Sequence, residues 1–202
     1  MTPRPSVEAE RRQQILEAAM NCFARKGYHL TTMDDIAAEL PFSKGLLYYY
    51  FKTKRDLFLD ILENWMDSSL KAWEAMSSQD EKAATQICKC LDYGVQLVTG
   101  SADLARVEME FYGELGRDPV ISDAFKTLFS EFRAQIKAIL EGGISQGEFR
   151  ALDTGALAAV VVGIYEGLAI QAMVEPDAFD WAVVSENLCE MVMRGIASPE
   201  KE

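Results

Sequence analysis

The chain of 202 residues has few of the residues and motifs on which enzymes commonly depend. It contains one histidine, His29, and we find neither a glycine-rich phosphate loop after a strand nor a nucleophile motif. We therefore expect a protein that is not an enzyme and that has no catalytic residues, no metal site and no cofactor. An enzyme acting on its own ligand is the alternative, and hydrolase or transferase activity would favour it.

Cysteine is also scarce, with Cys22, Cys88, Cys90 and Cys189 in the whole chain. This number and spacing do not form the disulfide framework of a small secreted protein. Cys88 and Cys90 are two residues apart, so on a helix they point to different faces, which argues against a metal clip. We expect reduced, buried cysteines.

The N-terminal sequence MTPRPSVEAERRQQ lacks the apolar run of a signal peptide. One later segment, GALAAVVVGIYEGLAIQAM at residues 155–173, is long and apolar enough to raise the question of a membrane span. Glu166 lies in its middle, and a charge at that depth is unfavourable. Because no second such segment exists, we expect a helix buried in a soluble core and no membrane partner.

Charge is distributed unevenly along the chain, whose net charge is −12. Residues 1–60 contain nine Lys or Arg and eight Asp or Glu, a net of +1. The remainder contain eleven and twenty-four, a net of −13. Such a difference between two parts of a chain indicates two tasks.

Helical patterns dominate, and no convincing alternating strand is present. Thr32 and Thr53 are each followed three residues later by aspartate, which is the capping box in its carboxylate form. Similar start signals and apolar stripes continue to the C-terminus. We predict an all-α fold of about nine helices, with a three-helix N-terminal domain and a larger helical C-terminal domain.

The segment PFSKGLLYYYFKTKR, residues 41–55, has four basic residues and no acidic one. Two short helices separated by a tight turn predict a helix-turn-helix, whose second helix places its N-terminal residues at base edges in the major groove. Ser43, Lys44, Gly45 and Leu46 occupy that end. Lys54 opposes the dipole of the next helix, a conflict that a docked DNA phosphate would remove.

The stretch TTMDDIAAELPFSKGLLYYYFKTKRDLF resembles the DNA-binding domain of the TetR (tetracycline repressor-like) family of transcriptional regulators. The resemblance covers roughly residues 8–65. The matching residues are Thr32, Ile36, Ala37, Ser43, Lys44, Gly45, Leu47, Tyr48, Tyr50, Phe51, Lys54 and Leu57.

For DNA contact we nominate Thr32, Ser43, Lys44, Gly45, Leu46, Tyr48, Tyr49 and Lys54. We assign Ile36, Leu47 and Phe51 to core packing, and Tyr48 equally to packing or contact. The chain departs from the family at Leu40-Pro41-Phe42, where Ala-Gly-Val is usual. Proline fixes φ near −65°, so the turn is expected to be built differently.

The resemblance implies that helices four to seven enclose a small-molecule pocket and that helices eight and nine dimerise. The sequence supports dimerisation separately, because Gly155, Ala159, Gly163 and Gly167 form a ridge of small residues that lets another helix approach closely. Close packing inside one subunit is the alternative. We add Trp181, Val184 and Leu188 to the expected interface.

For the effector pocket we nominate residues that combine apolar bulk with polar tips. Core packing is the favoured interpretation for each of them, except Glu166, a carboxylate whose apolar surroundings require a partner. They are Trp65, Met66, Trp73, Tyr93, Met109, Tyr112, Tyr165 and Glu166.

We therefore expect a cytoplasmic, homodimeric, ligand-responsive transcriptional regulator. Residues 1–55 would form the DNA-binding domain, and residues 56–202 the effector-binding and dimerisation domain. We expect a repressor released from a palindromic double-stranded DNA operator by a small, largely apolar effector. The alternative is a helical ligand- or lipid-binding module without DNA binding.

Overall fold

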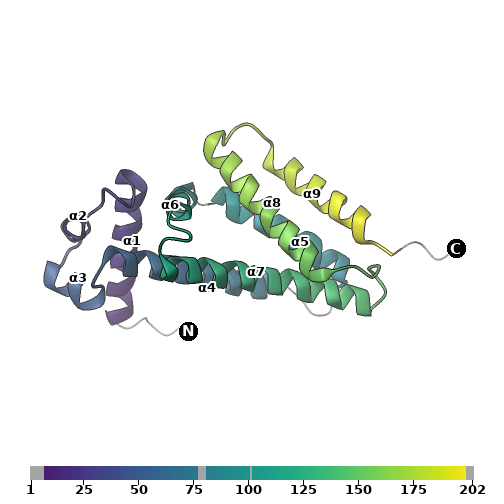
Figure 1. Ribbon diagram of the computed structural model, residues 1–202, viewed down its shortest axis with the longest axis horizontal. Helices are drawn as coiled ribbons and strands as arrows, with labels where there is room; N and C mark the ends of the chain where they lie inside the picture. Colours follow the sequence, from purple (N-terminus) through teal and green to yellow (C-terminus); the bar gives the residue numbers. More distant parts are fainter. Residues whose placement is uncertain (1–6, 77–80, 101, 199–202) are drawn as a thin grey trace. The chain divides into compact units, whose positions relative to one another are not determined.

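The computed structural model describes residues 7–76, 81–100 and 102–198. Within these ranges the chain forms helices and an isolated bridge between Phe149 and Ala197, without a β-strand (Figure 1). The predicted all-α fold is confirmed. The nine described helices are α1 (Val7–Lys26), α2 (Met33–Ala38), α3 (Lys44–Tyr50), α4 (Lys54–Met76), α5 (Ala83–Gly100), α6 (Ala102–Tyr112), α7 (Pro119–Ser145), α8 (Thr154–Val174) and α9 (Trp181–Ile196).

The helices divide into two compact units. The first comprises the described parts of Met1–Ser68 together with Arg106–Ser122, and the second those of Ser69–Ala105 and Asp123–Glu202. We refer to them as the N-terminal and the C-terminal unit. The division does not follow a single boundary in the sequence, because the second half of α6 and the start of α7 belong to the N-terminal unit.

Polar contacts explain why residues 106–122 belong to the N-terminal unit. The Glu110 carboxylate accepts a hydrogen bond from the backbone N–H of Tyr28. Arg55 forms an ion pair with Asp118, with 2.7 Å between nitrogen and oxygen. Gly27 permits the first contact, because its φ of +79° ends α1 and an added Cβ would lie 2.7 Å from Glu110 Oε1.

The core of the N-terminal unit comes from the apolar face of α1. Ile15 and Phe23 are almost completely buried there, as the helical spacing of apolar residues predicts. The aromatic segment supplies further core residues, because Leu47 has 0% and Phe51 4% of its surface exposed. This packing fixes α3 against the unit and leaves its opposite face to solvent.

The core of the C-terminal unit gathers around α5. The buried face of α5, with Ile87 and Leu91, packs in one cluster with residues of α7, α8 and α9. Tyr165 of α8 donates a hydrogen bond to the Leu91 carbonyl at 3.0 Å. Gly94 makes room for this ring, since an added Cβ would lie 2.3 Å from it.

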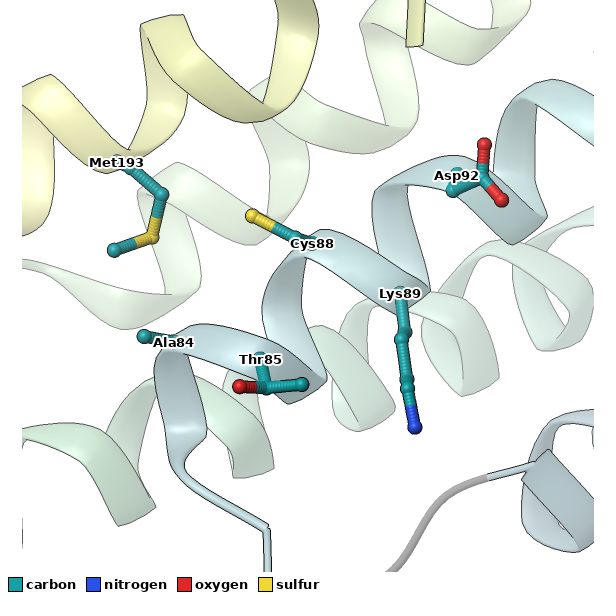
Figure 2. Close-up of a pocket in the computed structure, with 6 residues that line it drawn as sticks. All are labelled: Ala84, Thr85, Cys88, Lys89, Asp92 and Met193. Atoms are coloured by element: carbon teal, nitrogen blue, oxygen red, sulfur yellow. The ribbon is translucent and has the colours of Figure 1, made fainter. Parts of the chain in front are cut away.

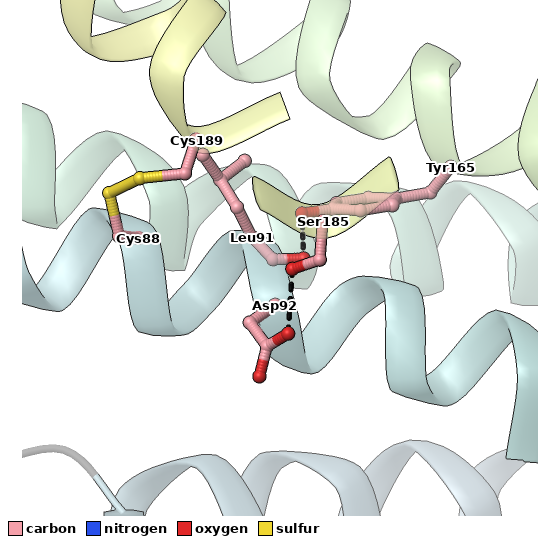
Figure 3. Close-up of a disulfide and its surroundings, with 6 residues drawn as sticks. All are labelled: Cys88, Leu91, Asp92, Tyr165, Ser185 and Cys189. Carbon is pink, nitrogen blue, oxygen red and sulfur yellow. Dashed lines mark hydrogen bonds between the residues drawn. A yellow bond between two sulfur atoms is a disulfide. The ribbon is translucent and has the colours of Figure 1, made fainter. Parts of the chain in front are cut away.

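Cys88 of α5 and Cys189 of α9 form a disulfide with a Cα–Cα distance of 5.2 Å (Figure 3). The expectation of reduced cysteines is therefore wrong for this pair. The two residues are 101 positions apart in sequence and meet only because α9 packs on α5. Cys22 and Cys90 are free thiols.

Among the described helices, α8 is long and apolar enough to cross a membrane by length and composition. Only 17% of its most apolar window is buried inside the chain, less than the sequence led us to expect. Ala158, Val161 and Val162 face the core, whereas Val160, Ile170 and Val174 are exposed. One face of α8 is thus packed and another is open.

Candidate nucleic-acid interface

The helix-turn-helix begins with α2, whose N-terminus has the predicted capping box. The backbone N–H of Asp35 donates to Thr32 Oγ1 at 3.1 Å, and the backbone N–H of Thr32 donates to Asp35 Oδ2 at 2.9 Å. The Thr32 hydroxyl also donates to the same carboxylate at 2.8 Å. Thr32 is exposed, but its hydroxyl already has an internal partner.

The turn around Pro41 is built from ordinary backbone. Among the described residues, the chain has no cis peptide bond and no residue other than glycine with positive φ. Glu39 ends α2 in a right-handed conformation, and Ser43 is extended with φ −68°. Pro41 therefore replaces the family's glycine without strain, because no left-handed residue is needed here. Phe42 is half-buried, as expected for an apolar anchor.

The N-terminal end of α3 is exposed. Ser43, Lys44 and Gly45 all face solvent, and within the described structure the Ser43 hydroxyl makes no capping hydrogen bond. An added Cβ at Gly45 would meet its nearest neighbour, Ser43 Oγ, at 3.8 Å, which is ordinary contact. The fold itself therefore does not require glycine at this position, whereas close approach of another molecule would.

Aromatic residues continue this face of α3. Tyr49 is 70% exposed, and its ring stacks edge-on against Tyr50 with centroids 5.2 Å apart. Leu46, Tyr48 and Tyr50 are half-buried. A rigid exposed aromatic with a terminal hydroxyl is suited to contact a phosphate or a base edge.

Lys44 is the basic residue of this exposed end. Its ammonium forms a 2.5 Å ion pair with Asp34, and both side chains are largely exposed. The hydrogen bond to Asp34 raises the pKa of Lys44, which therefore remains charged at neutral pH. Because exposed ion pairs contribute little to the free energy of folding, a DNA phosphate can replace Asp34 as the partner of Lys44 with little loss of stability.

Lys54 has a structural contact instead of the predicted phosphate contact. Its Nζ donates to the carbonyl oxygens of Tyr28, His29 and Thr31 at 2.6, 2.9 and 3.0 Å. It also lies over the Tyr28 ring, 4.5 Å from the centroid. An ammonium has three hydrogens, and these carbonyls use all of them. Lys54 therefore holds the loop between α1 and α2, and we remove it from the expected DNA contacts.

Other ion pairs join α1 to α2. Arg25 pairs with Glu39, and Lys26 pairs with Asp35 at 2.5 Å, so the end of α1 is held to both ends of α2. These hydrogen bonds lower the pKa of both carboxyl groups. Lys52 donates to the Tyr48 carbonyl at the end of α3 at 2.8 Å. The contacts to α1 thereby hold α2, the first helix of the helix-turn-helix, at both of its ends.

The nominated effector residues belong to different units. Trp65, Met66, Met109 and Tyr112 lie half-buried in the N-terminal unit. In the C-terminal unit, the Trp73 and Tyr93 rings lie 6.4 Å apart, and the Tyr93 hydroxyl donates to the Ser69 carbonyl at 3.0 Å.

Trp73 is 7% exposed and forms part of the C-terminal core. Glu166 is half-buried on α8. Within the described residues, we find no cluster of three or more His, Cys, Asp or Glu placed to hold a metal ion.

A shallow, open depression lies on the surface of α5 and α9 (Figure 2). The residues that line it are Ala84, Thr85, Cys88, Lys89, Asp92 and Met193. None of the nominated effector residues is among them. Sequence reasoning missed this place because its residues are ordinary ones for a helix surface, and only the packing of α9 on α5 brings them together.

The ridge of small residues on α8 is open. Gly155, Ala159 and Gly163 are exposed, and no described atom lies within 4 Å of a Cβ added at Gly163 or Gly167. Packing inside one subunit therefore does not account for the ridge. Leu188 is a correction, because it is 5% exposed and lies in its own unit's core.

Trp181 and Val184 of α9 are half-buried. On the same helix Val183 is 48% and Met191 59% exposed. These two exposed residues replace Leu188 among the expected interface residues.

Comparison with known proteins assigns both parts of the chain. A family model described as bacterial regulatory proteins, tetR family, matches residues 15–61, and one described as BetI-type transcriptional repressor, C-terminal, matches residues 92–197. The uncharacterized HTH-type transcriptional regulator YfiR of Bacillus subtilis is 32% identical over 153 residues, 74% of each chain.

Full-length relatives agree with this assignment. The HTH-type transcriptional repressor KstR2 of Rhodococcus jostii is 25% identical over 98% of this chain and 99% of its own length. A putative transcriptional regulator from Saccharomonospora viridis, solved in complex with choline, superposes with a TM-score of 0.82 at 26% identity, covering 94% of this chain and 99% of that one. The chain therefore belongs to the TetR family of bacterial transcriptional regulators.

Proposed function

We propose that the protein is a repressor that binds a palindromic DNA operator with α3 and releases it when a small effector binds. The observation that carries this proposal is the exposed end of α3, where Ser43, Lys44 and Gly45 face solvent beside Tyr49. The helix fits a major groove, and the glycine allows its backbone to come close to the DNA.

The repressor acts as a homodimer in this proposal. The open ridge on α8 and the exposed Val183 and Met191 of α9 support a helical interface across a two-fold axis. Two recognition helices about 34 Å apart would then read successive major grooves on one side of the operator. An apolar face of this kind is otherwise unfavourable in water.

Effector binding shifts the population between two dimer geometries. Three helices, α4, α6 and α7, have residues in both units, so a change in the C-terminal unit has a covalent route to the DNA-binding unit. Within the N-terminal unit, the Glu110–Tyr28 and Arg55–Asp118 contacts connect the ends of α6 and α7 to the residues around the helix-turn-helix, so a displacement of α6 or α7 would act on them. An effector that bound both geometries equally would release nothing.

The effector is a small, largely apolar organic molecule in this account. The relative solved with choline makes a quaternary ammonium compound the first to test, because such cations bind over aromatic rings and beside carboxylates. The half-buried Glu166 of α8 is the carboxylate nominated for such a site. Isothermal titration with choline and with a neutral apolar analogue would distinguish a cationic from an apolar site.

Selection of genomic DNA fragments by the purified protein tests the proposal. We expect enrichment of a palindrome whose half-sites are about one helical turn apart, and affinity that falls steeply with salt. The proposal also expects soluble, cytoplasmic protein. Absence of any enriched fragment at low salt would contradict it and would favour a helical ligand-binding module without DNA binding.

A further inference from the structure

The disulfide between Cys88 and Cys189 lies on a seam between α5 and α9 that carries a second cross-link. Ser185 donates a hydrogen bond to Asp92 Oδ1 at 2.6 Å (Figure 3). Asp92 lies four positions from Cys88, and Ser185 lies four positions from Cys189. Asp92 follows Cys88 and Ser185 precedes Cys189, so the two helices run antiparallel here. The covalent link and the hydrogen bond thus join the same two helices one turn apart.

The reducing environment in which a DNA-binding regulator works suggests a role for this disulfide beyond stability. A DNA-binding regulator, the function proposed above and the premise of this inference, works where glutathione and thioredoxin keep thiols reduced. Disulfides in that environment are usually transient and serve catalysis or redox sensing. A Cα–Cα distance of 5.2 Å allows the pair to close without displacing the helices.

Access differs among the four cysteines. Cys88 lines the open depression on α5 and α9, together with the polar Thr85 and Lys89 (Figure 2). Cys22 is completely buried, and Cys90 is half-buried, does not line the depression, and has a pKa that burial raises to about 12. A small water-soluble oxidant can therefore reach Cys88 from the depression, whereas neither Cys22 nor Cys90 lines it. Cys22 and Cys90 therefore serve as controls for the reaction of Cys88.

We propose that Cys88 and Cys189 form a reversible oxidation site for hydroperoxides, whose state controls operator binding. The Cys88 thiolate attacks one peroxide oxygen, the O–O bond breaks, and Cys88 becomes a sulfenic acid while the other oxygen leaves as water or an alcohol. The Cys189 thiolate then attacks the Cys88 sulfur and releases water. Two thiols and one hydrogen peroxide thus give one disulfide and two waters, and a reducing dithiol reverses the change by exchange.

The effect on DNA follows from where α9 lies. Its opposite face carries Val183 and Met191, which belong to the proposed dimer surface. In the dithiol state, the Ser185–Asp92 hydrogen bond and the buried Leu188 and Val192 hold α9, so it remains docked with more freedom. In a reducing cell without a signal, a repressor is in the dithiol state and bound to its operator. The disulfide state forms when an oxidant is present, and we expect this state to bind the operator more weakly.

The first experiment follows the chemistry by mass spectrometry of the intact protein. Hydrogen peroxide should remove two hydrogen atoms per chain, and a reducing dithiol should restore them. With a sulfenic-acid trap such as dimedone, Cys189→Ala should accumulate an adduct on Cys88, whereas Cys88→Ala should leave Cys189 unlabelled. Cys22→Ala and Cys90→Ala should behave as wild type. A disulfide that never forms with excess peroxide, or that resists the dithiol, overturns the proposal.

The second experiment measures operator affinity of the oxidised and reduced dimer. We expect oxidation to weaken binding about tenfold, within the usual range for two coupled sites, and Cys88→Ala to abolish the difference. Equal affinity of the two states overturns the proposal. Failure of the reduced protein to bind any DNA would instead refute the proposed repressor function, because it does not depend on the redox chemistry.

Discussion

Replacement of Lys54 by methionine would remove an ammonium group while keeping most of the side chain's length. In the structure this ammonium donates to three backbone carbonyls of the loop after α1, at 2.6 to 3.0 Å. The variant leaves those three oxygens to find water or remain unsatisfied. The loop that joins α1 to the helix-turn-helix then loses its main anchor.

The magnitude follows from the bonds lost. A hydrogen bond from a charged group contributes about 1.5–3 kcal/mol when buried, and we take about 1 kcal/mol for each because Lys54 is only half-buried. The loss is then roughly 2–4 kcal/mol, which corresponds to a fall in Tm of roughly 4–16 °C for a chain of this size. Circular dichroism during thermal unfolding measures it directly.

The matched control is Lys44→Met on the exposed end of α3. Its ion pair with Asp34 lies in solvent, so we expect little change in Tm. The salt dependence of operator binding should respond in the opposite way. Lys44→Met should reduce the slope of log affinity against log salt by about 1.8 for two protomers, because each lost phosphate contact removes about 0.9. Lys54→Met should leave the slope unchanged.

A Lys54→Met variant that unfolds at the wild-type temperature and loses about the same salt slope as Lys44→Met would show that Lys54 does not anchor the loop. Lys54 would then exchange its carbonyl contacts for a phosphate on the operator. The two measurements use the same purified proteins, so a difference in preparation cannot account for that result.

Gly45→Ala should leave Tm unchanged, because the added Cβ has room, yet weaken operator binding about tenfold. Gly27→Ala, at φ +79° and against Glu110, should instead destabilise the fold by roughly 1–3 kcal/mol. If Gly27→Ala lost as much operator affinity as Gly45→Ala without a change in Tm, this contrast would be wrong. Gly163→Leu should turn the dimer into a monomer in size-exclusion chromatography with multi-angle light scattering while the helical content stays the same, whereas a surviving dimer would place the interface elsewhere. The hydrogen bond from Arg55 lowers the pKa of Asp118, so this contact stabilises the N-terminal unit above the ordinary aspartate pKa and is lost as pH falls through the lowered value. Asp118→Asn should therefore reduce the fall of the unfolding midpoint at acidic pH. An unchanged fall would show that the ion pair contributes nothing to stability.

Local features of the fold were predictable from the sequence because their causes are local. Thr53 and Asp56 form the second capping box, with backbone-to-side-chain distances of 2.9 and 3.1 Å, as their spacing predicted. The burial of Leu47 and Phe51 followed from helical periodicity in the same way. Such interactions join residues three or four positions apart.

Features that depend on distant residues were not predictable from the sequence. The carbonyls that bind Lys54 come from a loop more than twenty positions away, so its position at a helix N-terminus pointed to a phosphate. Cys88 and Cys189 are 101 positions apart, and neither spacing nor composition indicated their contact. The burial of Leu188 depends on which face of α9 meets α5, which periodicity alone does not determine.

We expect the exposed end of α3 to contact the operator. Fluorescence anisotropy of a labelled operator with the double variant Lys44→Ala, Tyr49→Ala tests it most directly, with Lys137→Ala of the C-terminal unit as the control. We expect the double variant to lose specific binding while it remains folded, and the control to bind like wild type. Unchanged operator affinity of the folded double variant would show that this end of α3 does not contact the operator.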